Sequence, residues 1–96
     1  MPAYETIFAM PSNLSEEERN QGVKEVEKRI EEASGTVKSS EGMGEKRMAY
    51  KVKGHELAYY HLIKFDCPPK GIEVIKVHYR NNSNRYIRNM LVKEEI

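Results

Sequence analysis

The chain has 96 residues, of which 39% are apolar and 32% are charged, and its formal net charge is +1. This length predicts one domain, residues 1–96, with a single hydrophobic core, and the apolar content excludes a disordered chain. The only cysteine, Cys67, excludes an intrachain disulfide, and its place before two prolines predicts a half-buried structural thiol. No apolar run reaches transmembrane length and no signal or transit peptide pattern is present, so we expect an intracellular protein or a processed mature form.

The charge is distributed unevenly along the chain. Residues 1–35 contain eight acidic and four basic side chains, a net charge of −4, whereas residues 36–96 contain seven acidic and twelve basic ones, a net charge of +5. A basic half is compatible with a polyanionic partner. An acidic, solvated helix followed by ordinary basic strands is the simpler explanation, so charge alone does not establish such a partner.

The first third of the chain predicts a strand followed by a helix. Residues 3–10 contain the aromatic and β-branched side chains typical of a strand, and the proline that follows ends it. Ser15 and Glu18 have the spacing of a capping box, and Gly35 is placed to end the helix in a left-handed conformation, which predicts a helix over residues 15–34. Its apolar stripe follows steps of three and four residues through Val23, Val26, Ile30 and Ala33.

The middle of the chain predicts two strands joined by a turn. The second strand starts at Thr36, continues through the glycines at 42 and 44, and ends at Val52. Residues 53–56 predict the turn, and residues 57–66, which are dense in aromatic and aliphatic side chains, predict the third strand.

The last third predicts a second helix and a fourth strand. Two prolines, at 68 and 69, end the third strand and open the helix, since proline is tolerated in the first turn. A loop over residues 81–84 and a strand over residues 86–93 complete the chain. The order β-α-β-β-α-β predicts an α+β, ferredoxin-like domain, a four-stranded antiparallel sheet with two helices on one face. The apolar stripe of the second helix is Ile72, Ile75 and Tyr79.

The segment from Gly44 to Tyr50 has an unusual composition for a strand. Glycine inside a strand weakens it and marks a bulge or a close approach of backbones. Lys46 and Arg47 are adjacent, so their side chains point to opposite faces. These features favour an edge that meets another molecule over an ordinary core strand.

Two of the predicted strands are apolar on both faces. Because the helices cover only one face, the other face is expected to expose apolar surface, which favours a partner. An ordinary scatter of surface aliphatic residues is the alternative explanation. In the third strand the two alternating sets are Leu57, Tyr59, Ile63 and Phe65 against Ala58, Tyr60 and Leu62, and in the fourth they are Ile87 and Leu91 against Tyr86, Met90 and Val92.

The sequence shows no catalytic or metal-binding constellation. His55, His61 and His78 are far apart and lack the spacing of metal ligands. The glycine-rich phosphate loop of acylphosphatases is missing after the first strand, and the third strand lacks the basic and aromatic run of an RNA recognition motif. We therefore predict a protein that is not an enzyme and that holds no cofactor and no metal.

Four segments of the chain carry a resemblance to a known family: Tyr4–Phe8, Gly44–Tyr50, Ala58–Phe65 and Tyr86–Lys93. In this order they resemble the Tyr-Glu-x-hydrophobic start, the Gly-x-Arg-x-Leu-Ala-Tyr segment, the Tyr-Tyr strand and the last strand of the bacterial-type ribosomal protein S6 family of the small subunit. The resemblance covers essentially the whole chain, although Lys51 stands where the family often has proline and the loop at 81–84 looks longer and more polar than usual.

The resemblance implies a structural constituent of the small ribosomal subunit. Members of the family pair with ribosomal protein S18, and the pair binds the central domain of 16S-type rRNA during assembly. No membrane and no small-molecule substrate are implied, and the ribosome would be cytoplasmic in a bacterium, or mitochondrial or plastid for a mature organellar form. The residues expected to contact RNA are Tyr4, Lys51, Lys53, Arg85, Arg88 and Lys93. Those expected at the interface with the partner protein are Lys46, Arg47, Met48, Tyr50, Tyr60 and Met90.

Two other functions fit the residues less well. A ferredoxin-like binding or regulatory module would form a homodimer through its open sheet face, and a stable dimer at low concentration would favour it. An enzyme of the acylphosphatase type is disfavoured by the missing phosphate loop.

Overall fold

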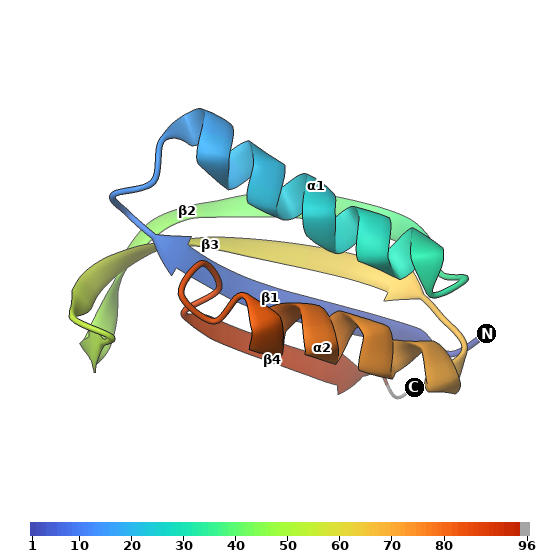
Figure 1. The fold of residues 1–96 in the computed structure, drawn as a ribbon. Helices are drawn as coiled ribbons and strands as arrows, with labels where there is room; N and C mark the ends of the chain where they lie inside the picture. The colour runs from blue at the N-terminus through green and yellow to red at the C-terminus, as the bar shows by residue number, and fades with distance from the viewer. Residues whose placement is uncertain (95–96) are drawn as a thin grey trace.

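A computed structural model describes residues 1–94. Its strands form one antiparallel sheet in the order β2-β3-β1-β4, and both helices lie on the same face of that sheet (Figure 1). The predicted ferredoxin-like α+β fold is therefore confirmed. Within residues 1–94, no helix is long and apolar enough to cross a membrane. The elements are β1 (Ala3–Pro11), α1 (Glu16–Glu32), β2 (Thr36–Val52), β3 (His55–Asp66), the short 3₁₀ helix η1 (Pro69–Gly71), α2 (Ile72–Asn81) and β4 (Arg88–Lys93).

Helix α1 begins at the predicted capping box. The hydroxyl of Ser15 accepts a hydrogen bond from the backbone N–H of Glu18 at 3.1 Å, and the Glu18 carboxylate accepts one from the N–H of Ser15 at 2.9 Å. Both bonds hold the pKa of Glu18 below its ordinary value, because they favour the charged carboxylate. The bond from the Ser15 backbone has the larger effect. The capping-box prediction is confirmed.

The end of α1 differs from the prediction. Ser34, with φ of 68°, is the left-handed residue, and Gly35 is not. The N–H groups of Ser34 and Gly35 donate to the carbonyls of Glu31 and Ile30, the two bonds of a Schellman motif. Glycine is required at 35 for a different reason, since a Cβ there would lie 2.7 Å from the carbonyl oxygen of Asp66. The predicted role of Gly35 as the left-handed residue was wrong.

The hydrophobic core lies between the helices and the sheet. The predicted stripes of both helices point into it, and Ile30 is completely buried. Cys67 is also completely buried, rather than half-buried as predicted, and its burial raises the pKa of the thiol. The principal core side chains are Phe8, Met10, Val26, Ile30, Ile63, Phe65, Ile75, Tyr79 and Tyr86.

The β2–β3 hairpin is long and irregular. Its register shifts between Gly42 and Gly44, and Gly44 has φ of 81°, as expected for a bulge at this glycine. Lys53 and Gly54 both have positive φ, 51° and 85°, which is the pattern of a two-residue type I′ turn. The predicted four-residue turn is therefore shorter, because β3 already begins at His55.

Strand β4 begins at Arg88, later than predicted, because the residues before it belong to the core. Tyr86 is 1% exposed, and its ring packs edge-on against Phe8 with 5.4 Å between the ring centroids. Its hydroxyl donates to the carbonyl oxygen of Gly22 in α1 at 2.7 Å. Tyr86 thus joins the loop before β4 to the first helix.

We expect Gly71→Ala to lower the free energy of unfolding by about 1–3 kcal/mol, the usual cost of overpacking. A Cβ at position 71 would lie 2.6 Å from the carbonyl oxygen of Ala33 and 2.9 Å from the Cys67 sulfur. The control is Gly42→Ala, whose Cβ would meet only the His61 Nδ1, at 3.8 Å, and which should change stability by about 0.5 kcal/mol or less. Urea denaturation measures both, and an equal loss in the two variants would contradict the close packing around Gly71.

Candidate protein and RNA interface

Strand register defines the face of the sheet that the helices leave uncovered, called the open face below. Ile7 of β1 pairs with Leu62 of β3 on one side and with Met90 of β4 on the other. Because successive side chains alternate between faces, every second residue of these strands joins the same surface. In β1, β3 and β4 the open face comprises Glu5, Ile7, Ala9, Tyr60, Leu62, Lys64, Arg88, Met90 and Val92. From β2, Ser39 and Glu41 join it opposite Lys64 and Leu62.

The centre of the open face is apolar and partly exposed. Met90 is 55% exposed and Val92 39%, while Ile7 and Leu62 are half-buried beside them. A shallow groove of about 360 Å³ lies next to Met90 and contacts Tyr60 and Arg88. Several large apolar side chains that lie together on one exposed face are typical of an interaction surface. The predicted exposure of apolar surface on the second face is therefore confirmed.

The tip of the β2–β3 hairpin extends beyond the helices and bends away from them (Figure 1). A small second cluster holds it there, in which Met48 is 6% exposed and packs with Ala9, Ala58 and Ile87. The ammonium group of Lys53 at the turn donates to the carbonyl oxygen of Ser83 at 3.2 Å. Met48 was expected at the partner interface, but its side chain instead fixes the hairpin against the sheet.

Cations surround the apolar centre at its hairpin end. The guanidinium carbon of Arg88 lies 5.7 Å from the centroid of the Tyr50 ring, and Tyr50 is 65% exposed. Arg47 and Lys51 both pair with Glu56, at 3.4 and 3.9 Å. Exposed pairs of this kind contribute little stability, so a partner can compete for these cations at low cost. Lys46 is exposed on the same hairpin, opposite Ala58.

Two residues expected to contact RNA lie away from this surface. Tyr4 is 7% exposed and stacks on Phe65 in the core at 5.7 Å between centroids, so its ring is closed to a nucleotide. Arg85 lies beside α1, where its guanidinium pairs with the Glu25 carboxylate at 2.8 Å. Burial alone would raise the pKa of Glu25, but the hydrogen bond and the charge of Arg85 outweigh it and hold that pKa below its ordinary value.

Lys93, the remaining residue expected to contact RNA, is exposed near the other end of the sheet. It is the last residue of β4 and pairs with Tyr4 in the register. Lys93 and Arg88 are at opposite ends of β4, with Met90 and Val92 between them. Lys93 is therefore far from the cations of the hairpin.

The structure adds residues that the sequence did not single out for the site. Ile7, Leu62 and Val92 complete the apolar centre around Met90. The sequence already showed that β3 and β4 have apolar residues on both faces, and Leu62 and Val92 are among these residues. Ile7 could be assigned to this face only from the pairing of β1 with its neighbours.

The histidines show no sign of catalytic or metal chemistry. His61 bonds to the hydroxyl of Ser40 through its Nε2 at 2.7 Å, and burial lowers its pKa. Across residues 1–94, no group of three or more His, Cys, Asp or Glu side chains is placed to hold a metal ion.

Comparison with known proteins identifies relatives in sequence and in structure. Residues 3–93 match the family model described as "Ribosomal protein S6". The small ribosomal subunit protein bS6 of Helicobacter pylori is 30% identical and aligns with 99% of this chain, which spans 66% of its length. The bS6 protein of Christiangramia forsetii is 28% identical over 97% of this chain and 82% of its own length. The crystal structure of 30S ribosomal protein S6 from Thermotoga maritima superposes with a TM-score of 0.91 at 30% identity, over 97% of this chain and 87% of that one. These relatives are structural ribosomal proteins and not enzymes, in agreement with the prediction.

Proposed function

The chain belongs to the ribosomal protein S6 family, and on this premise we propose that it is a structural constituent of a bacterial small ribosomal subunit. In that role it binds the central domain of 16S-type rRNA together with ribosomal protein S18, on the ribosome of the bacterial cytoplasm. The bacterial origin of the relatives supports this location.

The observation that carries the proposal is the open face, with its exposed apolar centre and its rim of cations. Both helices pack on the opposite face, so Met90 and Val92 gain no cover from the chain's own core. Burying an exposed apolar side chain contributes about 25 cal/mol for each Å² removed from water, which favours a protein partner at this centre. The nearby cations suit phosphate groups, and they are Lys46, Lys51, Lys53 and Arg88.

The two parts of the surface suggest a division between the two partners. The apolar centre around Met90 and Tyr60 is the contact for S18, and the hairpin with Tyr50 and Arg88 is the contact for rRNA. Arg88 lies at the boundary, since it lines the groove beside Met90 and also faces the Tyr50 ring. A mixed surface of this kind explains why a protein with a net charge of only +1 can assist RNA binding.

The test is a titration of a labelled rRNA central-domain fragment with this chain, with and without S18, at increasing KCl concentrations. We expect weak binding by the chain alone and binding at least about tenfold tighter with S18, about 1.4 kcal/mol. The affinity should fall as salt rises, because each cation that contacts a phosphate releases counterions.

Tight RNA binding without S18 would contradict the proposal. Size-exclusion chromatography across a dilution series provides the control for self-association. A dimer that persists at low concentration would indicate that a second copy, rather than S18, covers the open face.

A further inference from the structure

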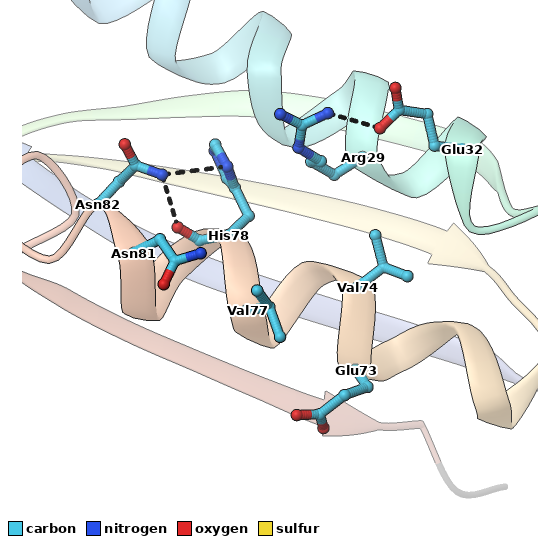
Figure 2. A pocket seen from close by; sticks show the side chains of 8 residues that line it. All are labelled: Arg29, Glu32, Glu73, Val74, Val77, His78, Asn81 and Asn82. Atoms are coloured by element: carbon cyan, nitrogen blue, oxygen red, sulfur yellow. Dashed lines mark hydrogen bonds and ion pairs between the residues drawn. The ribbon is translucent and has the colours of Figure 1, made fainter.

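A pocket between the two helices, far from the open face, contains a buried histidine. Figure 2 shows that α1 contributes Arg29 and Glu32 to its wall, whereas α2 and the residue after it contribute the rest. His78 lies at this pocket with only 5% of its surface exposed. A buried imidazole must satisfy both ring nitrogens with hydrogen bonds, so its partners determine which protonation state the fold accepts.

The partner of Nε2 is the hydroxyl of Tyr86, at 3.0 Å. That hydroxyl has a single hydrogen, which it donates to the carbonyl oxygen of Gly22 at 2.7 Å. Its oxygen is therefore left to accept, and the ring of His78 must donate from Nε2. This chain of bonds joins α2, through the loop before β4, to α1.

The partner of Nδ1 is the side-chain amide of Asn82, at 3.3 Å (Figure 2). The same amide nitrogen donates to the backbone carbonyl of His78 at 2.8 Å, which fixes its orientation, because a carbonyl oxygen only accepts. An N–H group therefore faces Nδ1, which must present a lone pair. With a hydrogen on Nε2 and none on Nδ1, His78 is satisfied only as a neutral ring.

The charged groups around His78 come from α1 and from the loop before β4. Burial is the main effect that lowers the pKa of His78, and Arg29 and Arg85 lower it further, while Glu25 and Glu32 oppose them. The Tyr86 hydroxyl is too weak an acid to compensate, since burial raises its pKa to about 12. These surroundings agree with the hydrogen bonds in disfavouring a charged ring.

We propose that His78 is an acid-sensitive latch whose neutral ring joins α1, α2 and the 82–87 loop, and whose protonation at Nδ1 breaks the contact with Asn82. Protonation would set two N–H groups against each other. Rotating the amide would not relieve this conflict, because its oxygen would then face the His78 carbonyl oxygen. The loop that is released leads directly into Arg88 and accepts the hydrogen bond from Lys53, so acid would loosen the support of the hairpin. This inference does not depend on the proposed function.

The direct test is a pH titration of the intact chain by long-range ¹H–¹⁵N correlation spectroscopy of its histidine rings. We expect His78 to carry its hydrogen on Nε2 at neutral pH and to stay neutral at pH values at which a free imidazole is already charged. An Nδ1–H ring, or a titration of His78 at the pH of a free imidazole, would overturn the proposal.

A pair of asparagine variants tests the specific partner in the same spectra. Asn82→Asp replaces the donor facing Nδ1 with a carboxylate and should raise the pH at which His78 is protonated. Asn81→Asp adds the same charge at the neighbouring exposed position and should raise it less. Equal shifts in the two variants would exclude the Asn82 contact as the latch.

The stability of the chain provides a second readout. An unfolded histidine takes up a proton near pH 6.5, before the folded ring with its lowered pKa does, so stability should fall as the pH drops below this value. Denaturant unfolding at pH 7 and pH 5 should show a smaller loss in His78→Gln than in the wild type. His61→Gln should reduce the loss as well, because the pKa of His61 is also lowered, so this variant measures a share of the pH dependence that does not come from His78. A wild-type pH dependence that survives in His78→Gln would contradict the latch.

Discussion

Ile30→Ala should lower the free energy of unfolding by about 2–5 kcal/mol, the range for truncating a buried isoleucine. Ile30 is completely buried and lies in the main cluster, where α1 meets β1, β3 and α2. Removing its outer carbons would leave a cavity inside this cluster. The walls of such a cavity relax only partly, and the extent of this relaxation accounts for the width of the range.

Urea denaturation at 25 °C measures this loss directly. Val74→Ala is the matched control, since Val74 is a β-branched residue on the other helix with 39% of its surface exposed. It should change stability by about 0.5 kcal/mol or less. A loss below 1 kcal/mol in Ile30→Ala would mean that α1 packs less tightly than the structure shows.

Met90→Glu should weaken binding to S18 by at least about thirtyfold, about 2 kcal/mol, which is the threshold of an interface hot spot. Met90 is the most exposed apolar side chain of the open face, and it lies on the edge strand β4, where it pairs with Ile7 of β1. A carboxylate at this position would lose its water on docking without gaining a partner. Its effect on folding should be small, because the side chain is 55% exposed in the free protein.

Isothermal titration calorimetry with S18 measures the loss, and two valines provide a matched comparison. Val92 on the open face and Val74 on the helix face are each 39% exposed. Val92→Glu should weaken S18 binding, whereas Val74→Glu should leave it unchanged. The reverse order would place the partner on the helices.

Local signals in the sequence predicted most of the fold. The capping box at Ser15 and Glu18 and the stripe through Val26 and Ile30 involve residues a few positions apart, so a single sequence contains all the information they need. Residues that depend on the shared geometry of two elements were harder to assign. Gly35 was expected to be left-handed, but the Schellman motif places Ser34 in that conformation and packs Gly35 against Asp66.

The candidate site was predicted less completely, because it depends on strand register and on the bending of the hairpin. Tyr4 has the aromatic character of an RNA contact, yet pairing with its neighbours turns its ring into the core beside Phe65. Met48 belongs to a segment whose glycine and cations predicted an exposed edge, but the bend of β2 buries its side chain against Ala9. Met90 belongs to a strand that was expected to be apolar on both faces, and Tyr50 was named through the family resemblance; both side chains are exposed in the structure, and their contacts with a partner stay a prediction.

Side-chain footprinting with hydroxyl radicals tests whether the open face is the docking surface. The chain would be oxidised alone and in a complex with S18 and the rRNA central domain, using residues that are exposed in the free protein as probes. Met90 and Tyr50 should become protected in the complex, while Val74 on the helix face keeps its reactivity. Unchanged oxidation of Met90 together with protection of Val74 would place the docking surface on the helices and not on the open face.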